Sequence, residues 1–316
     1  MPGLMKAILL ARDNALPETP VFDRLYPSST ELKFNLMLAN VTVVARNRRG
    51  IRVMGYGETA QFDAFPPNEN QKKLELSAAL PEKSGNGAGS KMISKLLGSL
   101  KSAAAVFVKV SSGDKLMING QTIDLHRALR LVIEVPTGTP ITLGGMLGAI
   151  GMSGTLGAVT MKPAFLRDTY IVSVASISGA LGSESLEVRQ VAHNVAFGKS
   201  SGTLTLGKVG GSVTFAGATS PKVVTGAITG DLNLTTDFSG VFTFASVAGD
   251  ITARLGTSSE VTIKSGKSRS LRATLGFSGY VKHRGEVTNV PIDDIRLGAG
   301  SEVRVNNKTY RWPAFS

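Results

Sequence analysis

Apolar and polar residues alternate in short runs along most of the chain. From residue 31 onward, "ELKFNLML", "NVTVVA", "GIRVMGYG" and "KLELSAAL" follow one another with Gly or Asn between them. A period of two places successive side chains on opposite faces of a β-strand. Gly and Asn between such runs are typical of turns. The pattern therefore predicts a succession of short β-strands.

The second half of the chain repeats itself. Each repeat holds two strand-like runs, of which the first begins at a serine and the second at a glycine, and both recur at the same constant spacing. The serines are Ser201, Ser220, Ser239 and Ser258, and the glycines are Gly211, Gly230 and Gly249. Farther out the spacing is looser, so the unit is about 18–20 residues and recurs from roughly 140 to 285. A fixed period of this length is typical of stacked repeats.

Alternation within each run predicts which side chains face the interior. We expect the apolar members to point inward and the polar members to point outward. The inward set is Leu204, Leu206, Val213, Phe215, Leu232, Leu234, Phe242 and Phe244, and the outward set is Thr203, Thr205, Thr214, Asn233, Thr243 and Thr252. A single unit cannot bury its apolar face alone, whereas stacked units bury a continuous core. The prediction is an all-β fold, a β-solenoid of two-strand coils. An antiparallel sandwich is the alternative, and it does not account for the near-constant spacing.

The repeats also resemble a known group. The segments Gly211–Phe215, Gly230–Leu234 and Gly249–Ala253 follow the pattern G-[DSN]-[VIL]-[TNS]-[VLF], and "IEVPTGTPITL" at 133–143 matches a strand followed by a "vPxGt" turn. Both features resemble the putative-adhesin group of β-solenoid proteins, which are domains of unknown function. The resemblance covers about 130–285 well and about 31–80 loosely. It implies the fold and is silent about activity.

Composition and punctuation divide the chain into four parts. They are an extended N-terminal arm at 1–33, a β-rich region at 34–135 with a linker and helix insertion at 81–107, the solenoid repeats at 136–285, and capping strands at 286–316. The arm is predicted from its prolines, which fix φ and do not continue a helix. Asn119-Gly120 and Asn306-Asn307 each separate two strand-like runs and predict β-hairpins.

One segment has a helical pattern instead. In "KMISKLLGSLKSAAAVF" the apolar residues recur at helical spacing with lysines between them. These apolar residues are Met92, Ile93, Leu96, Leu97 and Leu100. A basic amphipathic helix of this kind is a candidate partner helix, which docks on a membrane or on another protein. The alternative is that it covers an open end of the solenoid.

Composition limits the class of protein. The chain has 316 residues, of which 42% are hydrophobic, and it contains no cysteine. The apolar content is sufficient for a folded core, while the lack of cysteine excludes disulfides, thiolate metal sites and a cysteine nucleophile. No segment approaches the ~20 apolar residues of a membrane span. The apolar run at 7–11 is shorter than the roughly 7–15 residues of a secretory signal, so we expect synthesis in the cytoplasm without export.

Charge indicates the kind of partner. The formal net charge is +12, because 35 basic residues outnumber 23 acidic ones. A basic balance favours anionic partners such as acidic glycans or nucleic acid. Two concentrations of cations are candidate anion or partner surfaces. The first is Arg46, Arg48, Arg49 and Arg52, and the second is Lys264, Lys267, Arg269, Arg272, Lys282 and Arg284. Aromatic residues for base stacking are sparse beside both, and a solvated face is the alternative.

Residues suited to catalysis are few. Stacking places Asp231 and Asp250 in one column, one coil apart, with Ser212 before them and Ser270 after them. Paired carboxylates can serve glycoside hydrolysis, whereas polar residues beside glycine corners cap turns. The histidines lack the spacing of a zinc site, and the two "GKS" sequences lack the other glycine of a phosphate-binding loop. The sequence predicts no catalytic residue, cofactor or metal.

These observations predict a non-catalytic structural or binding protein that presents a rigid β-solenoid surface to protein partners or to copies of itself. Without an export signal, an adhesin-like solenoid suits a virus or phage particle, where it serves assembly, decoration or attachment. Two alternatives stay open. One is an intracellular scaffold that polymerises end to end, as bactofilin-type solenoids do, and predicted caps at both ends count against it. The other is a carbohydrate-active enzyme that uses Asp231 and Asp250.

Overall fold

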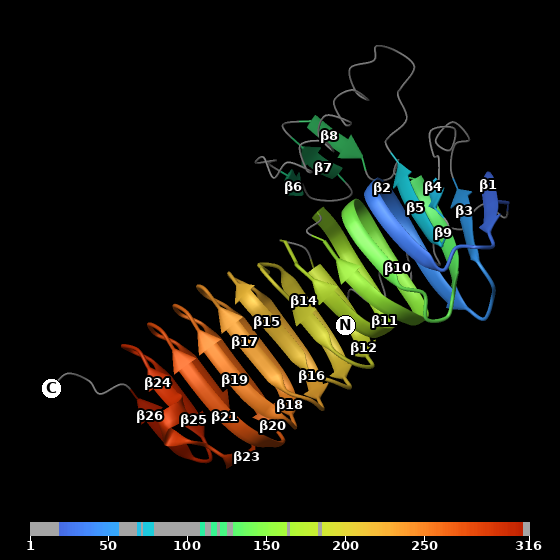
Figure 1. Cartoon of the computed structure of the whole chain (residues 1–316). Coiled ribbons are helices and arrows are strands. Elements are labelled where there is room, and N and C mark those ends of the chain that lie inside the picture. The colour runs from blue at the N-terminus through green and yellow to red at the C-terminus, as the bar shows by residue number, and fades with distance from the viewer. Residues whose placement is uncertain are drawn as a thin grey trace. The chain divides into compact units, whose positions relative to one another are not determined.

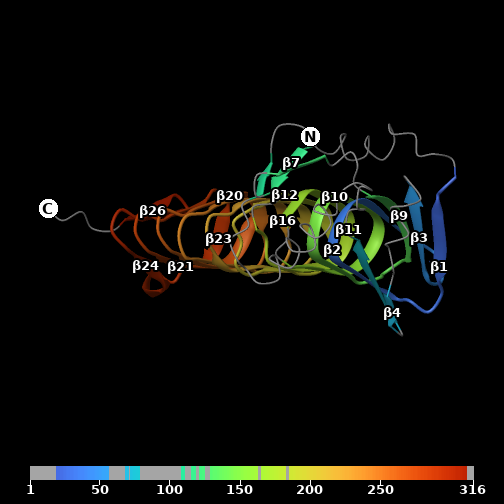
Figure 2. The same cartoon turned by 90° about the horizontal axis from the view of Figure 1, so that it is seen from above.

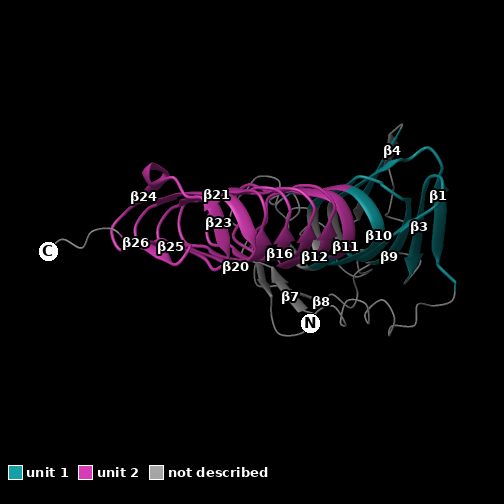
Figure 3. Cartoon of the chain, turned by 90° about the horizontal axis from the view of Figure 1, so that it is seen from below, with its two compact units in different colours: residues 1–157, 162–170 teal, residues 158–161, 171–316 magenta. Residues whose placement is uncertain are grey.

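A computed structural model of the chain describes residues 19–56, 68–70, 72–78, 108–110, 115–118, 121–124, 129–162, 165–182 and 185–311. These ranges hold strands, turns and one short 3₁₀ helix, η2 (Ile292–Asp294), and no α-helix. The chain forms two compact units (Figure 3), which are residues 1–157 with 162–170 (unit 1) and residues 158–161 with 171–316 (unit 2). The predicted all-β fold class is confirmed.

Unit 1 is built on a mixed β-sheet. Its strands are β1 (Phe22–Tyr26), β2 (Glu31–Arg46), β3 (Ile51–Tyr56), β4 (Asn68–Asn70), β5 (Lys73–Ala78), β9 (Leu129–Pro136) and β10 (Ile141–Met161), and β10 runs on into unit 2. Strand β2 pairs in parallel with β5, β9 and β10. Strand β3 is antiparallel to β1 and to β9. The segment predicted as an extended arm thus contains β1, which is part of this sheet.

A separate small sheet contains β6 (Val108–Val110), β7 (Lys115–Ile118) and β8 (Gln121–Asp124). Strands β7 and β8 are antiparallel, with Ile118 opposite Gln121. This pairing confirms that the two runs beside the predicted turn are antiparallel, and Asn119 and Gly120 themselves lie outside the described residues. The predicted partner helix, with Met92 to Leu100, lies outside the described residues, and the predicted domain boundaries stay predictions.

Unit 2 is a β-solenoid in which the chain alternates between two parallel ladders (Figures 1 and 2). The first ladder is β12 (Ser185–Val191), β14 (Thr203–Val209), β16 (Lys222–Ile228), β18 (Val241–Val247), β20 (Glu260–Ser265), β22 (Tyr280–His283) and β25 (Glu302–Val305). The second is the end of β11 (Phe165–Gly179), followed by β13 (Val195–Phe197), β15 (Val213–Ala218), β17 (Leu232–Thr236), β19 (Asp250–Leu255) and β21 (Lys267–Leu275). Strands β23 (Glu286–Asn289) and β24 (Ile295–Leu297) both pair with β21.

The register of the ladders reproduces the predicted period. Thr203 lies opposite Lys222, and Lys222 lies opposite Val241, so the step along the chain is the same for both coils and equals the spacing of the repeat serines. The step is slightly shorter between β12 and β14 and slightly longer between β20 and β22. Because parallel strands pair in register, residues at equivalent positions of successive coils form straight columns along the solenoid.

The interior of unit 2 is continuous from coil to coil. All of the residues predicted to point inward are buried, and those predicted to point outward are exposed or half-buried. Aromatic rings contact one another along the core, with centroid distances of 5.9 Å for Phe197 and Phe215, 5.6 Å for Phe215 and Phe242, and 6.5 Å for Phe242 and Phe244. Each coil therefore buries its apolar side chains against its neighbours, as stacked repeats require.

A hairpin covers β25 at the C-terminal end. Strand β26 (Lys308–Arg311) is antiparallel to β25, and the turn residues Asn306 and Asn307 have φ values of 50° and 60°. This confirms the predicted turn, because a two-residue hairpin of this type needs positive φ at both positions. The Asn306 side chain accepts a hydrogen bond from the Val287 N–H (2.8 Å) and donates one to the Val287 carbonyl oxygen (2.7 Å), which ties the turn to β23.

Candidate functional site

A column of polar side chains runs along one corner of unit 2. Its members are Asn194, Ser212, Asp231, Asp250 and Ser270. A side-chain oxygen of each of the first three members accepts the backbone N–H of the next, at 2.9 Å, 3.0 Å and 2.9 Å in chain order. The Ser270 hydroxyl donates to the Asp250 carboxylate at 2.8 Å. The predicted column is therefore present, Asn194 extends it, and its side chains satisfy backbone N–H groups at the corner.

Glycine precedes three of these side chains, Ser212, Asp231 and Asp250, and the coil before is close to the Cβ position of each of these glycines. A Cβ placed on Gly249 would lie 2.3 Å from Asp231 Oδ1 and 2.5 Å from the Gly230 carbonyl oxygen. The same holds one coil earlier, where a Cβ on Gly230 would lie 2.6 Å from Ser212 Oγ. The G-[DSN] step of the repeat thus has two linked roles: the glycine allows the close approach, and the next side chain caps the following coil.

Arg269 contacts both carboxylates of the column and offsets part of their charge. Its Nη2 lies 2.7 Å from Asp231 Oδ1 and 3.0 Å from Asp250 Oδ2. The hydrogen bond from the Asp250 N–H, together with Arg269, holds the pKa of the Asp231 carboxyl below its ordinary value despite partial burial. An acid that donates a proton in glycoside hydrolysis needs a raised pKa instead. The geometry of Asp231 and Asp250 therefore favours a structural role for this pair.

The C-terminal basic set divides into paired and unpaired cations. Besides Arg269, Lys267 lies 3.2 Å from a carboxylate oxygen of Glu286, and Arg272 lies 3.0 Å from one of Asp294. Within the described part of the chain, no hydrogen bond or ion pair engages the side chains of the other three members. These are Lys264, Lys282 and Arg284. The anion-binding role predicted for the set stays a prediction, and half of its charge is already offset within the protein.

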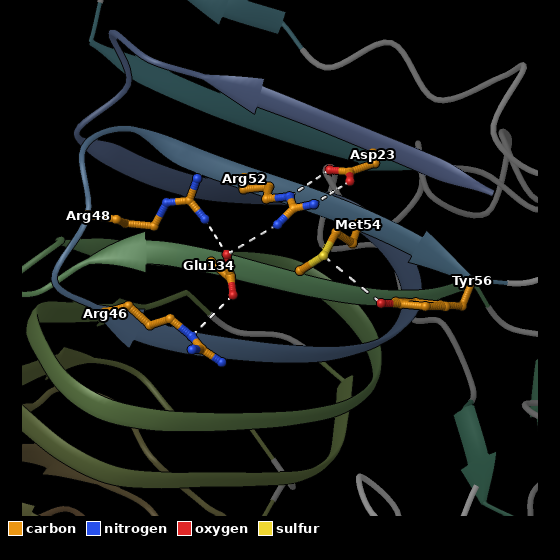
Figure 4. A network of polar contacts seen from close by, with 7 residues as sticks. All are labelled: Asp23, Arg46, Arg48, Arg52, Met54, Tyr56 and Glu134. Atoms are coloured by element: carbon orange, nitrogen blue, oxygen red, sulfur yellow. Dashed lines mark hydrogen bonds and ion pairs between the residues drawn. The ribbon is translucent and has the colours of Figure 1, made fainter. Parts of the chain in front are cut away.

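The N-terminal basic set gathers around one carboxylate, Glu134 of β9 (Figure 4). Arg46 Nε lies 3.1 Å from Glu134 Oε1, Arg48 hydrogen-bonds Oε2, and Arg52 Nη1 lies 3.9 Å from Oε2. Glu134 is largely buried, with a side-chain exposure of 14%. Three of the four arginines predicted to form an anion or partner surface are thus ion-paired within unit 1, and Arg49 makes no ion pair within the described residues. The role predicted for this set stays a prediction.

Asp23 of β1 completes this network. Arg52 Nε donates to Asp23 Oδ1 at 2.7 Å. This hydrogen bond lowers the pKa of the Asp23 carboxyl and raises the pKa of the Arg52 guanidinium. Two acidic residues therefore face the three arginines in Figure 4, and the surface charge here is smaller than the sequence predicts.

His283 is buried in the core of unit 2. Its Nε2 lies 2.9 Å from the Ser268 hydroxyl, which donates to the Val247 carbonyl oxygen (2.6 Å), and its Nδ1 accepts the Gly285 N–H (3.1 Å). These contacts fit a neutral imidazole with its proton on Nε2, and burial lowers the pKa of His283. Among the described residues, no group of three His, Cys, Asp or Glu side chains is placed to hold a metal ion.

One exposed feature was missed by the sequence reasoning. Phe238 and Phe277 are 60% and 61% exposed, although phenylalanine is commonly buried. Both follow strands of the second ladder at a corner of unit 2, and they lie two coils apart. Their separation of two repeats is visible in the sequence. The alternation rule does not extend into corners, however, so it does not predict which way they point.

Similarity to known proteins lies in the fold and not in the sequence. No protein-family model and no curated protein matches the sequence, and no helix among the described residues is long and apolar enough to cross a membrane. The structure is similar to crystal structures of a putative adhesin from Parabacteroides distasonis (9% identity, TM-score 0.36) and of one from Parabacteroides merdae (9%, 0.35). In both cases 90% of this chain and 94% of the other chain are covered. A putative adhesin from Bacteroides fragilis is similar at 15% identity and a TM-score of 0.27, with 90% and 95% covered. These similarities concern the fold alone.

Proposed function

We propose that this protein is a non-catalytic binding protein in which the β-solenoid of unit 2 holds rows of side chains against a partner. The observation that carries the proposal is the register of the ladders. Outward residues of successive coils stack in straight columns, such as Thr235, Arg254, Thr274 and Arg296, all of which are exposed. A surface with one side chain per coil suits a partner that is itself repetitive.

We propose that the protein is not catalytic because of the contacts that Asp231 and Asp250 make. Its carboxylates are one coil apart, yet they are occupied by Arg269 and by a backbone N–H. Catalytic carboxylates of glycosidases flank a bond of the substrate, where one transfers a proton and the other acts as a base or a nucleophile, so both must be accessible to the substrate. In this protein the carboxylate oxygens of Asp231 and Asp250 form contacts within a corner of the solenoid. We therefore assign these two residues a structural role and no catalytic role.

A panel of polysaccharides incubated with the purified protein tests this function. We expect some members to be retained on the immobilised protein without the formation of new reducing ends. The matched variants Asp231→Asn and Asp250→Asn should leave that retention unchanged. New reducing ends that disappear in either variant would establish the carbohydrate-active alternative and overturn the proposal.

At a finer level, we propose that the protein is a component of a virus or phage particle. The support is an adhesin-like repeat whose folding needs no disulfide, since the chain has no cysteine and can fold in a reducing cytoplasm. Mass spectrometry of purified particles from cells that carry the gene tests this. Stoichiometric recovery with the particles supports the proposal, and recovery in the particle-free fraction alone contradicts it.

The end-to-end scaffold gains no support at the C-terminal end of unit 2. There β26 pairs with the outer edge of β25, which removes that edge as a template for a second copy. Sedimentation velocity over a range of protein concentrations distinguishes the two cases. A species of constant size agrees with a capped solenoid, and filaments that grow with concentration would favour the scaffold.

A further inference from the structure

We propose that one corner of unit 2 binds an extended acidic polysaccharide that carries one negative charge per disaccharide. This inference rests on the proposed binding function and names its ligand class. The surface is formed by Phe238 and Phe277 on one side and by Arg254 and Arg296 on the other, and we call it the corner strip. The register of the second ladder and the exposure of these side chains define it.

The two phenylalanines occupy the same position in different coils. Thr236 lies opposite Leu255, and Leu255 opposite Leu275, so Phe238, Thr257 and Phe277 form one column beyond these strand ends. Strands in a sheet are about 4.7–4.9 Å apart, which places the two aromatic positions about 9.4–9.8 Å apart along the solenoid. Thr257, between them, is small and polar.

The backbone fixes this corner. The Ser258 N–H donates to the Phe277 carbonyl oxygen (2.8 Å), and the Ser259 hydroxyl donates to the Phe238 carbonyl oxygen (2.7 Å). These bonds connect the coils that carry the two aromatic residues through the coil between them. The spacing of the rings' attachment points is therefore set by the ladder.

The arginines alternate with the phenylalanines. Arg254 pairs with Thr235 on one side and with Thr274 on the other, and Thr274 pairs with Arg296. Each of these positions comes three residues before the corner column. Coil by coil, the corner strip therefore reads Phe238, Arg254, Phe277, Arg296. Figure 1 shows the four strands that end there, β17, β19, β21 and β24, in sequence along unit 2.

Both arginines are available to a ligand. They are exposed, and neither forms an ion pair within the described residues. The neighbouring cation Arg272, two residues before Thr274 on β21, is instead paired with Asp294. The free positive charge beside the corner column is thus confined to alternate coils.

Glycine separates the two columns in three of the four coils, and the exposed Asp237 takes the equivalent position in the coil that carries Phe238. Between the arginine and aromatic positions lie one inward residue and one glycine in three successive coils, namely Gly256, Gly276 and Gly298. A Cβ on Gly256 would lie 2.2 Å from the Asp237 carbonyl oxygen, and one on Gly298 would lie 2.3 Å from that of Gly276. These glycines are required by close packing, and they leave no outward side chain between the arginine and aromatic columns in these three coils.

The alternation matches the chemistry of one polymer class. In an extended, equatorially linked polysaccharide, each pyranose ring advances the chain by about one β-strand spacing. A disaccharide then spans two coils, so a carboxylate on every second sugar meets an arginine each time, and an aromatic ring faces each intervening sugar. Arginine binds carboxylates with paired hydrogen bonds. A single-stranded nucleic acid fits less well, because every nucleotide brings a phosphate while the strip offers a cation only at alternate coils.

Calorimetric titration of the full chain with hyaluronan oligosaccharides tests the proposal, since this polymer has one carboxylate per disaccharide. Neutral cello-oligosaccharides of equal length and oligo-dT serve as comparison probes. We expect hyaluronan to bind and both comparison probes to bind at least about tenfold more weakly. Equal binding of the neutral chain would overturn the role of charge, and tighter binding of oligo-dT would reassign the strip to nucleic acid.

Variants locate the binding on the strip. Phe238→Ala, Phe277→Ala and Arg254→Gln should each weaken hyaluronan binding by about tenfold. Arg189→Gln removes an exposed cation of β12, outside both predicted basic sets, and should leave binding unchanged. All four positions are exposed, so the variants are expected to fold, and thermal unfolding verifies this. Equal effects of Arg254→Gln and Arg189→Gln would mean that net charge alone drives binding.

The period itself can be tested at constant charge. The double variant Arg254→Thr with Thr274→Arg moves one cation by a single coil, so that the two arginines of the strip become adjacent. If binding depends on arginines that are two coils apart, the affinity for hyaluronan should fall by at least about tenfold. Unchanged binding would overturn the proposal. A chain that binds no hyaluronan but still retains other polysaccharides without cleaving them would refute this inference and leave the proposed function intact.

Discussion

Asp231 and Asp250 lie one coil apart in unit 2 and share one cation: Arg269 contacts both carboxylates, at 2.7 Å and 3.0 Å. The Asp250 N–H also donates to Asp231 Oδ1 at 2.9 Å. Two carboxylates this close repel each other unless a positive charge or a donor lies between them. The corner supplies both, which explains why acidic residues can occupy consecutive positions of this column.

Replacing Asp231 with alanine should lower the free energy of unfolding by about 1–2 kcal/mol, because the Asp250 N–H loses its acceptor. Asp231→Asn keeps an amide oxygen at the same place, as Asn194 does naturally in this column. It should therefore cost less than the alanine variant. Urea unfolding at neutral pH measures both. Equal losses would show that the charge contact with Arg269, and not the acceptor, supplies the stability.

Gly249→Ala should destabilise unit 2 by about 1–3 kcal/mol or more, because its Cβ would overlap Asp231 Oδ1 and the Gly230 carbonyl oxygen. Gly198 is the matched control. The nearest atom to a Cβ there is the Gly179 carbonyl oxygen at 3.7 Å, an ordinary contact distance, so Gly198→Ala should be close to neutral. The midpoints of thermal unfolding distinguish the two variants. Similar midpoints would contradict the close-approach explanation for the repeat glycines.

Phe215→Ala should cost about 3–5 kcal/mol, since this ring is 1% exposed and contacts both Phe197 and Phe242 in the core. Phe238→Ala removes the same side chain from a position that is 60% exposed. Its effect on the free energy of unfolding should be below about 0.5 kcal/mol. Denaturant titration of both variants measures the two losses in the free energy of unfolding, and only the loss in Phe215→Ala should be large. A large loss in Phe238→Ala would instead place that ring in the folding core.

Acidification should weaken unit 2 through His283. Its folded-state pKa lies below the ordinary value of 6.5 because of burial, so the unfolded chain binds the proton more readily. The stability that the neutral ring contributes is present above pH 6.5 and declines as the pH falls below that value. Unfolding free energies measured from pH 8 to pH 5 should show the decline.

A glutamine variant isolates this effect. His283→Gln can still hydrogen-bond Ser268 but does not titrate, so the part of the pH dependence due to His283 should disappear. An unaltered pH profile in His283→Gln would assign the decline to other groups.

The repeat of unit 2 is predictable from the sequence because stacking imposes it. Parallel pairing demands the same pattern in every coil, so the spacing of Leu204, Val223 and Phe242 encodes both the ladder and the inward face. The hairpin at Asn306-Asn307 is predictable for a similar local reason, since few residues accept its positive φ values.

The partners of the cations are harder to predict. Arg48 and Glu134 are distant in the sequence, and they meet only through the pairing of β3 with β9 and of β2 with β9. A cluster of arginines in the sequence therefore predicts that a local charge is positive, but it does not predict which distant carboxylates pair with these arginines. The exposure of Phe238 was missed because the two-residue alternation ends with the strand, and a corner residue has no face assigned by it.

The unequal steps of the solenoid have a consequence for how such a chain changes. The step along the chain is shortest where Ser185 of β12 lies opposite Thr203 of β14. It is longer where Glu260 lies opposite Tyr280, and longer again where Tyr280 lies opposite Glu302. The strands of this first ladder stay in register, so the added residues are taken up between them. Insertions at corners therefore enlarge the circumference of a coil and leave the rise per coil unchanged. The spacing that a bound polymer meets is protected from changes in length, and the corners are the places where new sequence can be added without disturbing it.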